Sequence, residues 1–113
     1  MVSPSLYASE QGIRIDSEQD ALDALYAHSL GLIFQPADLS PEFFDLSNGL
    51  AGAVFQKYVN YNAHMVILLP TEHKLGARIA ELAREHARHP NIRFFTSKAE
   101  AETWLRGHDV CGV

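Results

Sequence analysis

The apolar run Met65–Leu69 places the strongest constraint on the fold. Its residues are consecutively apolar instead of alternating with polar ones, and Pro70 follows directly. A strand with one face in water shows alternation, whereas a strand covered by helices on both faces reads as a continuous apolar segment. The run is also far shorter than the roughly 18 residues that a membrane-spanning helix needs. We therefore expect residues 65–69 to form the central strand of an α/β protein.

Helix and strand patterns precede this run. Ser17 and Asp20 have the spacing of a capping box, which predicts a helix from about Glu18 to Ser29. The short apolar run Leu32–Phe34 predicts a buried strand. At residues 40–42 a serine, a proline and a glutamate combine a capping side chain with a favourable first turn, so a helical turn begins there.

The main helix is expected over about Asn48–Tyr61, where apolar residues recur at helical spacing. It contains Gly49 and Gly52, each of which costs about 1 kcal/mol relative to alanine inside a helix. We attribute this cost to a helix face that lies close against the sheet or against a partner.

The second half continues the alternation. Thr71 can cap a further helix that Pro90 ends, and the apolar residues of 92–95 give another strand. Ser97 and Glu100 form a capping box for the last helix.

The N-terminal pattern suggests a hairpin, because apolar residues at 6–8 and 13–15 flank a turn-like segment at 10–12. The whole chain is then one domain, 1–113, with short frayed ends at 1–4 and 108–113. We expect a two- or three-layer α/β sandwich with a mixed sheet of four to five strands and about four helices. The expected core consists of Leu22, Leu25, Ile33, Leu50, Val54, Phe55, Val66, Ile67, Leu68, Ile79, Leu82, Phe94 and Leu105.

Charge and cysteine content exclude several classes of protein. The net charge is −5, and residues 1–70 hold two basic side chains against eight acidic ones. The basic residues of the second half are interleaved with glutamates, so no basic stripe for nucleic acid is expected. A single cysteine excludes an internal disulfide and a thiolate metal cage. Without a signal-peptide or membrane-span pattern, we expect a cytoplasmic protein that binds no membrane.

The segments Phe43–Gly52 and Phe55–Tyr61 resemble the signature of a bacterial family, domain of unknown function 4180. The helix start Gln19–Asp23 resembles that family as well, and together these segments cover most of residues 13–105. The family has no established activity, so this resemblance implies a relative and no reaction.

A more distant resemblance concerns the anti-sigma-factor antagonist (STAS) domain. The pattern of Leu32–Leu50 is an apolar strand, a loop, two aromatic residues and then a helix start, and it looks like the core of that domain. The resemblance implies a STAS-like fold. It also implies a protein switch, because in that domain phosphorylation of a serine or threonine beside an acidic residue changes the binding of a partner.

The candidate switch or anion site is therefore Asp45, Ser47, Asn48 and Gly49. A hydroxyl at a helix start lies beside unpaired backbone N–H groups, which can hold a phosphate, but a serine there more commonly caps its helix. The sequence leaves both roles of Ser47 open.

Tyr61 and Trp104, near helix ends, are the candidates for an interaction surface, because aromatic residues dominate interface hot spots. A metal site at His86 and His89 is disfavoured, since no third ligand has a recognisable spacing. We assign no catalytic residue, metal or cofactor.

The favoured function is a non-enzymatic regulatory or protein-interaction module with a protein partner, and a homodimer is left open. The alternative is a small-molecule or anion-binding protein that uses the helix start near Ser47.

Overall fold

The computed structural model describes residues 7–27, 31–45, 49–69 and 76–109. Within them the sheet has three parallel strands, β1 (Leu32–Phe34), β2 (Met65–Leu68) and β3 (Ile92–Phe95), in the order β1-β2-β3. Met65 pairs with residue 32 on one side and residue 92 on the other. The prediction of a central strand at 65–69 is confirmed.

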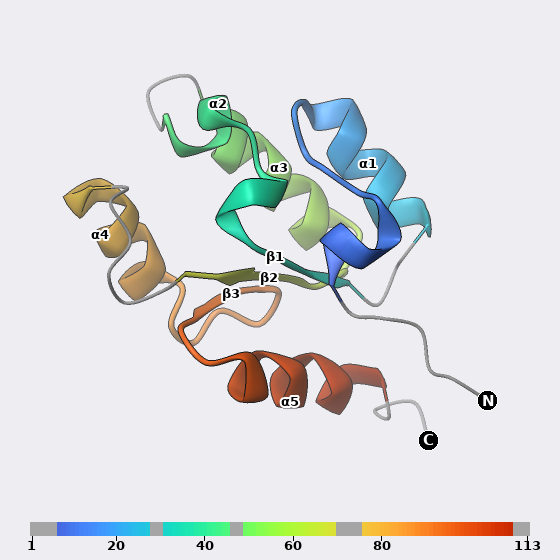
Figure 1. Ribbon diagram of the computed structural model, residues 1–113, viewed down its shortest axis with the longest axis vertical. Coiled ribbons are helices and arrows are strands. Elements are labelled where there is room, and N and C mark those ends of the chain that lie inside the picture. The colour runs from blue at the N-terminus through green and yellow to red at the C-terminus, as the bar shows by residue number, and fades with distance from the viewer. Residues whose placement is uncertain (1–6, 28–30, 46–48, 70–75, 110–113) are drawn as a thin grey trace.

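Helices cover both faces of this sheet (Figure 1). α1 (Glu18–Ala27), α2 (Pro41–Phe44) and α3 (Leu50–Asn60) lie on one face, and α5 (Lys98–Asp109) lies on the other. α4 (Ala77–Glu85) leads into β3, and two short 3-10 helices, η1 (Ala8–Gln11) and η2 (Pro36–Asp38), lie near β1. The described residues thus form three layers, helices, sheet and helix. None of these helices is both long and apolar enough to cross a lipid bilayer.

The side chains of β2 divide between two hydrophobic clusters. Met65 and Ile67 belong to the larger cluster with residues of α1, α3 and α4. Val66 and Leu68 point the other way, into a smaller cluster with Ala101 and other residues of α5. All four strand residues are buried, which is why the sequence shows no polar alternation.

Two predicted helix starts are confirmed by their caps. The Ser17 hydroxyl accepts a hydrogen bond from the backbone N–H of Asp20 at 3.2 Å, and the Asp20 carboxylate accepts one from the backbone N–H of Asp16 at 2.9 Å. At α5 the Ser97 hydroxyl accepts a hydrogen bond from the backbone N–H of Glu100 at 3.4 Å. Thr71, the predicted cap of the fourth helix, and Ser29 lie outside the described residues.

The predicted N-terminal hairpin is wrong. Gly12, with a left-handed φ of 70°, ends the 3-10 helix η1, and the backbone N–H of Ile13 donates to the Ala8 carbonyl at 2.9 Å without a β-bridge between the described parts of the two flanking segments. Instead Tyr7 forms a parallel bridge with Ile33, and Ile15 forms one with Leu39. The apolar residues at 6–8 and 13–15 suggested two paired strands, but Tyr7 and Ile15 each contact β1 or the residues that follow it.

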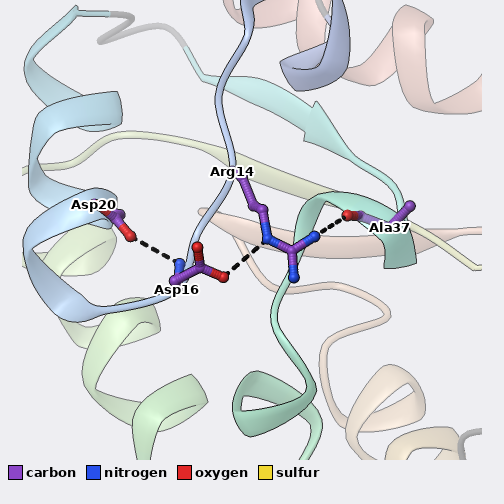
Figure 2. A network of polar contacts seen from close by, with 4 residues as sticks. All are labelled: Arg14, Asp16, Asp20 and Ala37. Atoms are coloured by element: carbon purple, nitrogen blue, oxygen red, sulfur yellow. Dashed lines mark hydrogen bonds and ion pairs between the residues drawn. The ribbon is translucent and has the colours of Figure 1, made fainter.

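Figure 2 shows what holds the segment 14–16 in this place. The Arg14 Nε donates to the Asp16 carboxylate at 2.9 Å, and its Nη1 donates to the Ala37 carbonyl at 2.8 Å. Asp16 is joined to α1 through its bond to Asp20 (Figure 2). These contacts join the start of α1 to the segment that follows β1.

The sheet is consequently smaller than expected, with three parallel strands among the described residues instead of four to five mixed ones. The predicted helix around Gly49 also changes. Gly49 lies before α3 with a left-handed φ of 78°, a conformation that glycine adopts at no steric cost. Gly52 lies inside α3 but is exposed, and no atom lies within 4 Å of where its Cβ would be. The expected packing of this glycine face against the sheet is therefore wrong, whereas its packing against a partner stays a prediction.

Most of the predicted core is buried. Its buried members are Leu25, Ile33, Val54, Phe55, Val66, Ile67, Leu68, Ile79 and Leu105. Leu50, Leu82 and Phe94 are partly buried and pack against the larger cluster. Leu22 is also only partly buried.

Replacing Ile67 by alanine should lower the free energy of unfolding by about 2 to 5 kcal/mol, because the side chain is completely buried and the change leaves a cavity. Chemical denaturation followed by circular dichroism measures this value. The control is Val59→Ala at a position 39% exposed, which should change stability by less than about 1 kcal/mol. Equal costs for the two substitutions would contradict a doubly covered β2.

Candidate functional site

Only part of the predicted switch site can be placed. Asp45 is exposed directly after α2, and Gly49 is exposed directly before α3. Ser47 and Asn48, which carry the switch hypothesis, lie outside the described residues. The capping and switch roles of Ser47 therefore both stay predictions.

A hollow of about 380 Å³ lies beside this site, where the starts of α1 and α3 meet. Three of its lining residues, Asp16, Glu18 and Glu42, carry carboxylates, and Gly49 lies at its rim. Carboxylates repel an anion, since like charges at short range are unfavourable. This environment disfavours a phosphate or other anion at the start of α3.

A second hollow, of about 440 Å³, lies between β3 and α5 on the other side of the sheet. We call it the β3–α5 groove. It is lined by Arg93, Phe95, Ala99, Glu100, Thr103 and Trp104. Trp104, one of the two predicted interaction residues, thus lies in a hollow whose lining is mostly apolar.

Three side chains pack around the Trp104 ring. The Arg93 guanidinium lies over the indole ring, 5.0 Å from its centroid, in a cation–π arrangement. The Phe95 ring lies beside the indole with centroids 6.1 Å apart. His64, just before β2, meets it edge-on with centroids 5.7 Å apart. Trp104 is therefore held between residues of β3 and the entry to β2.

Arg93 is itself held by the turn before β3. Its Nε donates a hydrogen bond of 2.8 Å to the carbonyl oxygen of His89. The His89 ring closes the same turn, because its Nδ1 accepts hydrogen bonds from the backbone N–H groups of Asn91 and Ile92, both at 3.0 Å. The buried Asn91 side chain donates to the carbonyl of Ala63 at 2.9 Å, which joins the turn to the segment before β2.

These bonds define the protonation state of His89. A nitrogen that accepts two N–H groups carries no proton, so the neutral ring has its proton on Nε2. Burial lowers the pKa of His89 below its ordinary value, and the nearby positive charges of His86 and Arg93 lower it further. Neutral His89 is therefore part of the folded turn.

The histidine pair lies close together at the end of α4 and in the turn before β3. The His86 and His89 rings lie 5.1 Å apart between centroids, and the His86 Nδ1 donates to the Leu82 carbonyl at 2.8 Å. Both δ nitrogens thus have protein partners. Among residues 7–27, 31–45, 49–69 and 76–109, no three His, Cys, Asp or Glu side chains are grouped so that they could hold a metal ion.

Tyr61, the other predicted interaction residue, lies elsewhere. It is 53% exposed at the end of α3, and its hydroxyl lies 3.1 Å from that of Tyr26, which is 63% exposed. The two rings meet edge to face with centroids 5.7 Å apart. Because α3 and α5 cover opposite faces of the sheet (Figure 1), Tyr61 and Trp104 belong to different surfaces.

The sequence did not single out Arg93 or His89 for this site. Arg93 on β3 stacks on Trp104 of α5, and no local sequence pattern predicts a contact between two separate elements. For His89 a weak signal exists. In an Asx turn the side chain of Asn or Asp accepts a hydrogen bond from the backbone N–H two residues later, and the His89 ring accepts the N–H of Asn91 in the same way.

Replacing Arg93 by alanine should lower the free energy of unfolding by about 1 to 2 kcal/mol, because the cation–π contact and the hydrogen bond to His89 are both lost. Fluorescence from Trp104, the chain's single tryptophan, should shift to longer wavelength as its ring meets more water. Arg84→Ala on the exposed side of α4 is the matched control and should change stability by at most about 0.5 kcal/mol. Unchanged emission in Arg93→Ala would contradict the stack.

Comparison with known proteins places the chain in a family. No curated protein and no solved structure matches it significantly, so the likeness to the anti-sigma-factor antagonist domain stays a prediction. Residues 3–105 match the family described as "Domain of unknown function (DUF4180)". This match covers nearly the whole chain and agrees with the resemblance at Phe43–Gly52. The chain belongs to the DUF4180 family.

Proposed function

We propose that this protein is a non-enzymatic protein-interaction module and that its partner binds in the β3–α5 groove. The observation that carries the proposal is the Arg93–Trp104 stack in a mostly apolar hollow. Tryptophan and arginine are, with tyrosine, the residue types most enriched among the few that dominate binding energy at protein interfaces.

The strand beside the groove supports this choice. β3 lies at the end of the strand order, and no described strand pairs with its outer side. The backbone N–H of Met65 donates to the Asn91 carbonyl and that of Leu69 to the Phe95 carbonyl, so odd-numbered residues of β3 face β2. By the alternation of a parallel ladder, the N–H and carbonyl of Phe94 point away from β2. A partner in the groove can therefore also reach an edge strand, as many bound peptides do.

The rival surfaces have less support. The hollow beside Gly49 is lined by three acidic residues, which weighs against anion binding there, although small-molecule binding stays the alternative prediction. Tyr26 and Tyr61 are 63% and 53% exposed, and their hydroxyls already contact each other at 3.1 Å. A regulatory role for Ser47 is a separate hypothesis, tested by comparing partner binding of Ser47→Asp with that of the parent chain.

The test is affinity capture of partners from a lysate of the source cells by the tagged full chain, followed by mass spectrometry. A partner of the groove should be depleted at least about 30-fold by Trp104→Ala, since hot-spot truncation costs about 2 kcal/mol or more. Tyr26→Ala, an exposed aromatic on the other face, is the matched control and should retain it.

Because Trp104 also packs against Phe95, its truncation can disturb folding, and circular dichroism checks each variant. Arg93→Glu provides a second variant in the same groove, with the charge reversed. Partners that bind Trp104→Ala and Arg93→Glu as they bind the parent, or that Tyr26→Ala removes instead, would refute the proposal.

A further inference from the structure

The turn before β3 couples the groove to one titratable ring. His89 makes two kinds of contact at once: its Nδ1 accepts the N–H groups of Asn91 and Ile92, and its carbonyl accepts the Arg93 Nε. The first contact needs an unprotonated ring, and the second holds the guanidinium that covers Trp104. The state of one nitrogen is thus linked to the groove through a continuous set of bonds.

We propose that His89 is a proton-sensitive latch of the β3–α5 groove, whose protonation opens the turn before β3 and releases Arg93 from Trp104. This inference deepens the proposed function and rests on it only for its effect on partner binding. The change within the chain stands on the geometry of the turn.

Protonation reverses the role of Nδ1. The nitrogen gains a proton and becomes a donor, so it faces the N–H groups of Asn91 and Ile92 without an acceptor between them. Ile92 is completely buried, and a buried N–H that loses its partner costs about 1 to 3 kcal/mol. The turn then opens, and the carbonyl that anchors Arg93 moves with it.

The surrounding charges act in the same direction. His86 at the end of α4 and Arg93 on β3 are the charged or titratable groups whose fields act on His89, and both oppose a positive charge on it. The pKa of His89 accordingly lies below its ordinary value of 6.5. Since the unfolded chain binds this proton more readily, the turn is most stable above pH 6.5 and loses stability as the pH falls through the folded pKa.

The experiment is an NMR titration of the full chain carrying His64→Gln, which removes the titratable ring that meets Trp104, from about pH 7.5 to about pH 5, the range in which histidine changes charge. The probe is the proton itself. We follow the His89 ring, the backbone amides of Asn91 and Ile92, and the indole N–H of Trp104. All four signals should shift with one common midpoint below 6.5.

Two variants separate His89 from its neighbour. His89→Asn keeps an acceptor that can bond the N–H groups two and three residues on but cannot titrate, so the shifts of Ile92 and Trp104 should disappear. His86→Gln removes the neighbouring ring whose charge lowers the pKa of His89, and its side-chain amide can still donate to the Leu82 carbonyl, so the transition should persist with a higher midpoint. An indole signal that follows His86 instead of His89, or a transition that survives in His89→Asn, would overturn the latch.

The titration of the His64→Gln chain decides the question even where His89→Asn fails to fold, because unequal midpoints for His89 and Trp104 in that chain already contradict the coupling. The latch and the proposed function fail separately. Partner capture that depends on Trp104 but is equal at both ends of the pH range refutes the latch alone. If His89 and Trp104 titrate with a common midpoint but Trp104→Ala binds the partner as the parent does, the groove is refuted as the binding site.

Discussion

The burial of β2 on both faces is the constraint on which the rest of the structure depends. Each of its four residues is buried, and their side chains alternate between two clusters. A strand of this kind is stable only if helices cover both sides of the sheet. The chain meets this requirement unequally, with α1, α3 and α4 contributing to the larger cluster and α5 to the smaller.

This inequality explains where the groove lies. On the face covered by α5 the smaller cluster holds the buried residues Ile33 of β1 and Val66 and Leu68 of β2. Phe95 and Trp104, nearer the β3 edge, pack against this cluster but are only partly buried. The lining of the β3–α5 groove is therefore the incompletely covered margin of the smaller cluster, and Arg93 lies across it.

Local signals predicted the elements well. Ser17 and Ser97 announced two helix starts because a capping hydrogen bond spans only three residues of sequence. The apolar run at 65–69 announced a central strand because burial on both faces removes polar alternation. The prediction of a hairpin failed because Tyr7 and Ile15 form bridges with residues far away in sequence, Ile33 and Leu39. Alternation of apolar residues indicates an extended segment but not the segment with which it pairs.

The site was less predictable for the same reason. Trp104 was singled out by its residue type, yet the contacts that make it part of a groove come from Arg93 on another element and from the turn at His89. Such contacts follow from the register of β3 beside β2 and from the position of α5 under the sheet. Neither is encoded in a local pattern, so sequence alone could name the aromatic residue but not its surroundings.

The account depends most directly on β3 being an open edge beside the groove, and amide hydrogen exchange measured by NMR in the free chain tests this. The N–H groups of Arg93 and Phe95 face β2 in the ladder, whereas that of Phe94 faces outward. The account predicts that the Phe94 amide exchanges at least about tenfold faster than both of its neighbours, because it has no ladder bond to protect it. A Phe94 amide protected as well as those of Arg93 and Phe95 would show that the edge is covered and would contradict the account.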